Sequence, residues 1–253
     1  MGGIKKFQKS VIAAMSPALV ALATGDNEDS KALREAIKNH LFDLPGPKYA
    51  NLPLTGPSAY VKELFRGFSE ISRSLETLEG IQFLVGRFPF RSKRISAERY
   101  LQFHFEAYLA EVYVLKVRLD RYLKLLRRQH RGDARLAEIC VHADALSQLV
   151  QASLKPILGI RHAHTHEERF KDEGISRLGT IALLMTGDDH KFATLMRNFY
   201  RIEHSKEKKR WKQIITRNNR EIRRLLNAFL DDLHPLLFDE KTGHIRLPQK
   251  LAS

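Results

Sequence analysis

The sequence predicts an all-α protein, an antiparallel bundle of long helices. Its most regular segment carries eight apolar residues at alternating spacings of four and three, which lie as one stripe on a single helix. These residues are Leu101, Phe105, Tyr108, Val112, Leu115, Leu119, Tyr122 and Leu126. Further apolar residues widen the stripe, as in the core of a bundle rather than an isolated coiled coil. No segment shows the alternation of apolar and polar residues that predicts a strand.

The N-terminal region is expected to stand outside this bundle. Residues 1–44 read as two short helices separated by a polar segment at 25–30. Residues 45–57 contain four prolines, which forbid a regular helix and mark a linker. The sequence therefore predicts three parts: an N-terminal helical extension with a Pro-rich linker (1–57), a helical bundle (58–237) and a polar C-terminal tail (238–253).

Within the bundle, residues that favour or disfavour helix ends set the predicted boundaries. The first helix begins at the capping residue Ser58 and is expected to end at Gly80. The last helix is expected to end at Pro235, because proline cannot continue a helix. Apolar periodicity places the intervening helices at 96–129, 134–154, 175–185 and 191–203.

The first 23 residues have some features of a secretory signal. Three lysines among the first nine residues precede a mostly apolar run at 11–23, and Ala21-Leu-Ala23 resembles a cleavage site. Ser16-Pro17 interrupts this run, so we favour a helix that is not removed. The run is too short to span a membrane, and no later segment qualifies.

The cysteine content limits both the chemistry and the compartment. A single cysteine, Cys140, excludes an intrachain disulfide and any cysteine-rich zinc site. It lies in an apolar helical pattern that is typical of a small core residue. This composition fits a reducing compartment, so we expect a cytoplasmic protein without a membrane.

The charge balance favours an anionic partner. The chain has 43 Lys and Arg against 29 Asp and Glu, a net charge of +14. Nucleic acid is the simplest such partner, because its phosphates release counterions to cationic side chains. Cations that recur at helical spacing are the expected RNA-binding residues: Lys206, Arg210, Arg217, Arg220, Arg224 and Arg128.

These cationic stripes have an alternative interpretation as solvated helix faces. On that interpretation, acidic neighbours such as Glu207 and Glu221 pair with them locally. Few aromatic residues interleave with the charges, so base stacking on a single-strand platform is not expected.

The segment 159–168 concentrates the residues best suited to chemistry. An arginine can hold a phosphate bidentately, and histidines titrate near neutral pH and can move protons. The segment contains two glutamates and the residues Arg161, His162, His164 and His166. Arg161 and one of these histidines are therefore expected to approach a single phosphate.

Two local geometries remain open for this segment. The sequence Thr-His-Glu-Glu at Thr165 fits a capping box, so a helix could begin there and offer its N–H groups to an anion. Alternatively, one helix begins with Pro156 in its first turn and contains Gly159. In that case His162 and His166, four residues apart, share a face while His164 points away.

Other common chemistries lack their motifs. The sequence contains neither G-x-x-x-x-G-K-[ST] nor G-x-G-x-x-G, and nothing resembles a nucleophile elbow. The histidines of 159–168 and nearby acidic residues could ligate a metal, but the H-E-x-x-H order is missing and alternate histidines on a helix point apart. We therefore expect histidine to carry the chemistry, with no metal and no cofactor.

The motif and the preceding long helix resemble the HEPN superfamily, the higher-eukaryote and prokaryote nucleotide-binding domains. The segment Leu101–Tyr113 is similar to the long core helix of bacterial members. Residues 160–166 stand where their Arg-Asn-x-x-x-His motif usually falls. Arg161 and His166 match its two fixed positions, and His162 matches the polar position where asparagine is commoner.

The resemblance covers residues 58–237 and implies a homodimer whose two motifs meet across the interface. Many such domains are metal-independent endoribonucleases, often toxins or defence effectors. RNA, a second copy of the chain and a cognate antitoxin are therefore the partners that the resemblance implies.

The expected reaction is attack of a ribose 2′-oxygen on the adjacent phosphorus, which releases a 5′-hydroxyl and leaves a 2′,3′-cyclic phosphate. His166 would take the 2′-OH proton, and the His166 of a second copy would protonate the leaving oxygen. Arg161 would stabilise charge on the phosphoryl oxygens, and His162 would orient the pair or share the acid role. The alternative is a non-catalytic helical module that binds RNA or protein.

Overall fold

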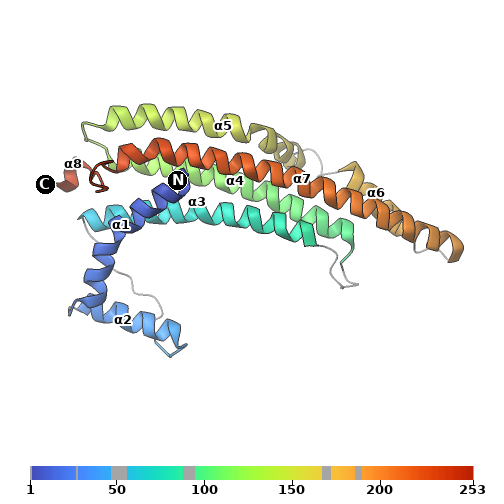
Figure 1. The fold of residues 1–253 in the computed structure, drawn as a ribbon, viewed down its shortest axis with the longest axis horizontal. Coiled ribbons are helices and arrows are strands. Elements are labelled where there is room, and N and C mark those ends of the chain that lie inside the picture. Colours follow the sequence, from blue (N-terminus) through green and yellow to red (C-terminus); the bar gives the residue numbers. More distant parts are fainter. Residues whose placement is uncertain are drawn as a thin grey trace. The chain divides into compact units, whose positions relative to one another are not determined.

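The computed structural model describes residues 2–26, 28–46, 56–87, 95–166, 172–185 and 190–252, which are almost entirely helical (Figure 1). The helices are α1 (Gly3–Thr24), α2 (Glu28–Leu41), α3 (Gly56–Arg87), α4 (Ala97–Gln129), α5 (Leu136–His166), α6 (Glu173–Leu184), α7 (His190–Leu237) and α8 (Gln249–Ala252). Among the described residues, β pairing is limited to an isolated bridge between Phe238 and Ile245. The prediction of an all-α fold is therefore confirmed. None of the described helices has the length and apolar character needed to cross a membrane.

Three helices run past the residues that we expected to end them. The helix predicted at 134–154 is α5, which continues to His166. α3 continues beyond Gly80, and the two helices predicted between residue 191 and Pro235 are the single helix α7, with Pro235 inside it. A glycine inside a helix costs about 1 kcal/mol relative to alanine. The buried residues Ile81 and Val85 follow Gly80, and the burial of their side chains offsets that cost.

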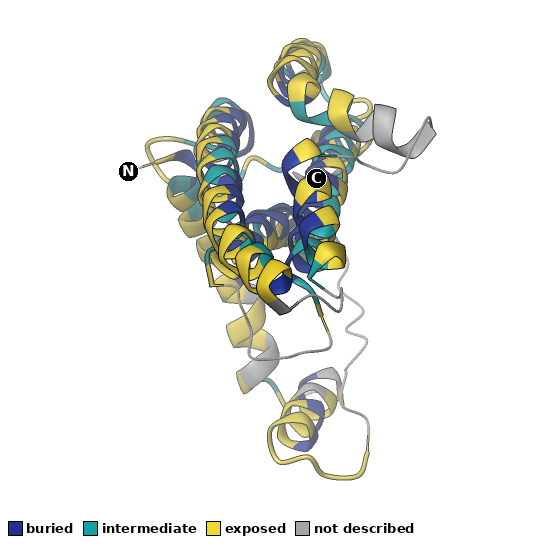
Figure 2. Ribbon diagram, turned by 90° about the vertical axis from the view of Figure 1, so that its right-hand side faces the viewer, coloured by how far each residue is buried: buried dark blue, intermediate teal, exposed yellow. Residues whose placement is uncertain are grey.

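The chain forms two compact units, and the helices α3, α4, α5 and α7 contribute residues to both. Unit 1 comprises Met1–Glu70, Arg121–Leu146 and Leu226–Ser253. Unit 2 comprises Ile71–Asp120 and Ser147–Leu225. The predicted N-terminal extension and C-terminal tail thus fall in the same unit. Along the long helices, buried positions recur on one side while the other side is exposed (Figure 2).

In unit 1, an aromatic cluster around Phe7 packs α1 against the other helices. The Phe7 side chain is fully buried, and its ring centroid lies 5.5 Å from that of Phe68 and 5.6 Å from that of Phe238. It also lies 6.4 Å from Tyr122 and 6.5 Å from His234. This cluster ties α1 and the first residue of the predicted tail into one core.

A buried chain of hydrogen bonds follows the end of α4 in unit 1. The Tyr60 hydroxyl lies 2.9 Å from Nε2 of His130, and Nδ1 of His130 lies 3.0 Å from Oδ2 of Asp133. Asp133 also accepts hydrogen bonds from the backbone and the guanidinium of Arg135. Because the carboxylate can only accept, neutral His130 donates from Nδ1 and accepts the Tyr60 proton at Nε2. Burial lowers the pKa of His130, although its hydrogen bond to Asp133 acts in the opposite direction.

In unit 2, the buried side chain of Asn219 on α7 joins three helices. Its oxygen accepts a 3.0 Å hydrogen bond from the Tyr108 hydroxyl on α4. Its nitrogen donates to the backbone oxygen of Leu78 at 3.1 Å and to Gln82 at 2.9 Å, both on α3. Burial raises the pKa of Tyr108, so the hydroxyl stays protonated and keeps donating. A buried polar group without a partner costs about 1–3 kcal/mol, so this network fixes the register of α7 against α3 and α4.

The hydrogen-bond chain at His130 predicts that acid weakens the fold. The folded-state pKa of His130 is below its unfolded value, so the folded protein binds fewer protons. The contribution of neutral His130 to the stability of the folded protein is therefore complete above about pH 6.5 and is lost as the pH drops below that value. We expect the melting temperature to fall between pH 7.5 and pH 5.5, and the fall to be smaller in His130→Gln. His244→Gln, at an exposed position, is the matched control. An equal fall in wild type and His130→Gln would contradict this assignment.

Candidate nucleic-acid interface

The structure decides between the two geometries of the histidine-rich segment. Helix α5 runs without interruption from Leu136 through Gly159 to His166. The capping-box alternative, in which a helix begins at Thr165, is therefore wrong. One helix does contain Gly159 and His166, as in the other alternative, but it begins at Leu136 and has Pro156 in its interior rather than in its first turn. Thr165 stands in the last turn of a helix, where carbonyl groups rather than N–H groups lack partners. Within the described residues, this end of α5 therefore presents carbonyl groups rather than free N–H groups.

The continuous helix sets the register of the predicted catalytic residues. Arg161, His162 and His166 all belong to the last turns of α5. Positions 162 and 166 are four residues apart in one helix and so share a face, whereas position 164 does not. The side chains of 161–166, and residues 167 and 168 altogether, lie outside the part of the chain that the structure describes.

The predicted RNA-binding cations are divided by their ion pairs. Lys206 lies 3.7 Å from Glu203, and Arg224 lies 2.7 Å from Glu221, so both have carboxylate partners on α7 itself. Arg217 and Arg220 are exposed and have no ion pair with any described residue. Arg128 is exposed on α4, in unit 1, whereas the α7 cations belong to unit 2.

Arg210 is held in an ion-pair network at the start of α6. Asp172 caps α6 by accepting a 3.1 Å hydrogen bond from the backbone nitrogen of Ile175, and it also pairs with Arg210. Glu207 is almost fully buried, and its carboxylate lies 2.7 Å from Nε of Arg210. The guanidinium lies 4.8 Å from the ring centroid of Trp211. These contacts give Arg210 a part in fixing α6 against α7.

The exposed side of α7 carries a surface hollow without an acidic residue. The cations that line it are Lys209, Lys212, Arg217 and Arg220, which we call the α7 basic face; Gln213 and Thr216 complete the lining. None of the four cations has an ion pair among the described residues. Sequence reasoning missed Lys209 and Lys212, although they follow the same helical spacing. Only the structure shows that neither has an ion pair with a described residue.

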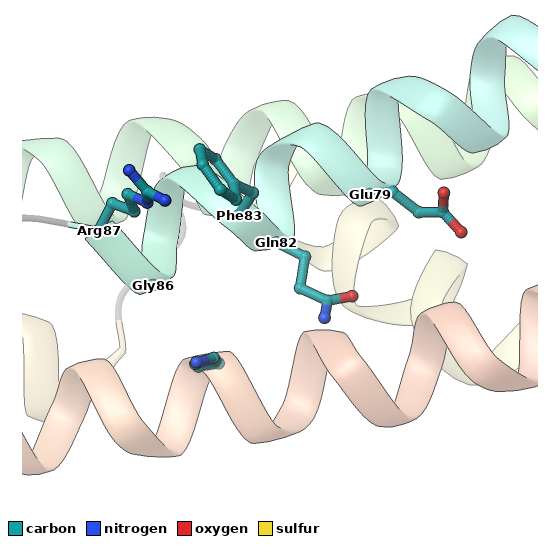
Figure 3. Close-up of a pocket in the computed structure, with 6 residues that line it drawn as sticks. Glu79, Gln82, Phe83, Gly86 and Arg87 are labelled. Atoms are coloured by element: carbon teal, nitrogen blue, oxygen red, sulfur yellow. The ribbon is translucent and has the colours of Figure 1, made fainter.

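A second hollow beside the α7 basic face lies between α3 and α7, and we call it the α3–α7 groove (Figure 3). Phe83 on α3 is 55% exposed, and the guanidinium carbon of Arg87 lies 4.3 Å from the centre of its ring. Figure 3 shows the Gln82 side chain directed toward α7, where it binds Asn219. Lys212 contributes to both hollows.

The α3–α7 groove changes one expectation about base stacking. From the sequence, few aromatic residues interleave with the cations, so a stacking platform was not expected. Phe83 and Lys212 are far apart in the sequence but line the same hollow, and the exposed ring of Phe83 lies beside Arg87. An exposed aromatic ring next to cations is the combination that single-stranded nucleic acid binds. The spacing of four between Phe83 and Arg87 became a signal only once α3 was seen to continue past Gly80, where we expected this helix to end.

No group of three or more side chains that could hold a metal occurs within the described residues. The histidines at 162, 164 and 166 lie outside the side chains that this finding covers. Comparisons with protein-family models, with curated proteins and with solved structures find no match to this chain.

Measurements of unfolding free energy should distinguish Arg210, which holds α6 against α7, from the cations of the α7 basic face. Arg210→Ala leaves the buried carboxylate of Glu207 without its partner, so we expect a loss of about 1–3 kcal/mol of unfolding free energy. Arg217→Ala, on the exposed side of the same helix, should change it by less than about 0.5 kcal/mol. Chemical denaturation of both variants measures the difference. Equal stability of the two would show that the Asp172 network does not hold α6.

Proposed function

We propose that this protein binds RNA through the α7 basic face and the α3–α7 groove, and that it cleaves the bound strand. One observation carries the binding proposal. Four exposed cations line a hollow with no acidic residue, and none is neutralised by a described carboxylate. Lys209 and Arg220 are eleven positions apart, roughly 16 Å along the helix, which is long enough to contact several phosphates. The net charge of +14 supports the same partner.

The proposal extends to the strandedness of the RNA. Phe83 offers an exposed ring beside Arg87, and Lys212 lines the same hollow; unpaired bases can stack on such a ring while phosphates contact the cations. In duplex RNA the bases are stacked on one another and cannot use this ring. The α3–α7 groove therefore favours single-stranded segments.

For the chemistry, we propose a HEPN-like antiparallel bundle that acts as a homodimer and a metal-independent endoribonuclease. His166 takes the proton of a ribose 2′-OH as this oxygen attacks the adjacent phosphorus. The P–O5′ bond breaks, and the His166 of the second copy gives a proton to the leaving 5′-oxygen. Arg161 stabilises the negative charge on the phosphoryl oxygens, and His162 orients the pair. The continuous α5 supports these roles because positions 162 and 166 share one face.

The runner-up is a non-catalytic RNA-binding module. The α7 basic face favours it, because phosphate binding there does not need the motif at 161–166. A toxin or defence role, with a cognate antitoxin as a further partner, belongs to the catalytic proposal alone.

Salt titration tests the binding proposal. We expect the affinity for a 20-nucleotide single-stranded RNA to fall linearly with salt on a log–log plot. Replacing Lys212, Arg217 and Arg220 with Gln should weaken binding roughly ten- to a hundredfold and reduce the slope by about two, since each phosphate contact contributes about 0.7. The control variant replaces three exposed lysines of unit 1, Lys5, Lys9 and Lys38, and has the same net charge. Equal weakening in both variants would mean that net charge, not the α7 basic face, drives binding.

Cleavage with EDTA present tests the catalytic proposal. Wild-type protein should cut RNA and leave a 2′,3′-cyclic phosphate that mass spectrometry detects. Arg161→Ala and His166→Ala should each reduce the rate by about a hundred- to ten-thousandfold. His164→Ala, purified in the same way, should reduce the cleavage rate only slightly, because position 164 does not lie on the helix face that positions 162 and 166 share. Normal cleavage by both variants, or suppression by the chelator, would overturn these roles.

A further inference from the structure

A third hollow in unit 2 is separate from the α7 basic face and lies between α4 and α5. Its volume is about 770 Å³, within the range of roughly 300–1,000 Å³ that is typical of sites for small ligands. Helix α4 contributes Tyr113 and Lys116, and α5 contributes residues between Gln148 and Gly159. We call it the α4–α5 groove.

Two of the α5 residues that line the α4–α5 groove are small. Ala152 and Gly159 are seven positions apart on α5, so they lie on one face of the helix. A side chain added at Gly159 would meet no atom within 4 Å. The absence of a side chain there leaves open space above the helix backbone, and a planar ligand could lie on it.

The walls of the α4–α5 groove combine three kinds of group that suit a nucleotide. Tyr113 is 41% exposed and offers an aromatic surface for stacking. Gln148 and Gln151 are exposed amides that can donate to and accept from the edge of a base. Lys116 and Lys155 supply positive charge for a phosphate.

The two lysines are not equivalent. Nζ of Lys116 lies 2.7 Å from Oδ2 of Asp120, so its charge is partly neutralised. Lys155 is exposed and forms no ion pair with a described residue. Lys155 is therefore the stronger candidate for a phosphate contact.

The position of the α4–α5 groove along α5 relates it to the cleavage motif. Gly159 at its end is two residues before Arg161, and α5 continues unbroken through both. Positions 155, 159, 162 and 166 follow one another at spacings of four, three and four, which is one face of a helix. A nucleotide in the groove would thus be followed along the same face by the motif.

We propose that the α4–α5 groove binds one nucleotide of single-stranded RNA, with the base over Ala152 and Gly159 and a phosphate at Lys155. This inference rests on the proposed RNA function and assigns the groove as its substrate-positioning subsite. It does not require that the bound strand be cut.

The test uses a probe that cannot be cleaved. A fluorescein-labelled 2′-O-methyl tetrauridylate lacks the attacking 2′-OH, so fluorescence anisotropy measures binding alone. Four nucleotides are also few enough to reduce the share of binding that comes from the α7 basic face. We expect Gly159→Leu, Tyr113→Ala and Lys155→Gln each to weaken binding about tenfold, the size of effect that loss of one stacked base produces.

Matched variants control for folding and charge. Gly80→Leu makes the same change at another helical glycine of unit 2 where an added side chain meets nothing, and Lys38→Gln removes a charge elsewhere. Both should bind like wild type. Leucine favours helix over glycine, so the melting temperature of Gly159→Leu should be equal to or above that of wild type.

Three outcomes decide the matter. Unchanged binding by Gly159→Leu, or displacement of the probe by tripolyphosphate as readily as by unlabelled tetrauridylate, would overturn the proposal in favour of simple charge attraction. If the variants bind as expected but the wild type does not cut RNA, the groove is supported and only the endoribonuclease proposal is rejected. No binding of the probe by the wild type would overturn the groove while leaving cleavage of longer RNA to be judged by its own assay.

Discussion

The arrangement of unit 2 depends on the buried amide of Asn219. Its side chain is 5% exposed and satisfies partners on both α3 and α4. An apolar contact tolerates small slides of one helix along another, but a buried hydrogen bond does not, because a displaced donor or acceptor would remain unpaired. Asn219 therefore selects one register of α7 among those that the apolar residues alone would permit.

That register determines what the outer surface of α7 presents. Trp211, Ile215 and Ile222 are buried, and the exposed positions of the same stretch of α7 include the four cations of the α7 basic face. The same register brings Lys212 beside Gly86 of α3, in the hollow that Phe83 also lines. The long cationic helix thus has two kinds of arginine: Arg210 holds α6 in place, and Arg217 and Arg220 remain available to an anion.

Much of the fold could be predicted from the sequence because helical periodicity is a local property. The stripe from Leu101 to Leu126 predicted α4 to within a residue or so of its bounds. The errors came where local signals and packing disagree. Gly80 is a weak helix residue, yet the buried Ile81 and Val85 beyond it keep α3 intact. The capping-box sequence at Thr165 is equally local, and α5 overrides it.

The candidate site was less predictable, because ion pairs and stacking partners are set by contacts between distant residues. Arg210 and Asp172 are 38 positions apart, and no spacing rule relates them. Local spacing indicated the pairing of Arg210 with Glu207, which the structure contains. It could not indicate the pairing with Asp172, nor show that Lys209 and Lys212 have no carboxylate partner among the described residues. The contribution of Phe83 likewise became visible only once α3 and α7 were placed side by side (Figure 3).

The central claim is that single-stranded RNA lies along the α7 basic face and the α3–α7 groove. Photocrosslinking of RNA that contains 4-thiouridine, followed by peptide mapping, tests it most directly. We expect crosslinks in the peptides that contain Phe83 and residues 209–220, and we expect these crosslinks to disappear at high salt. Crosslinks confined to peptides of unit 1, such as those of α1 and α2, would contradict it.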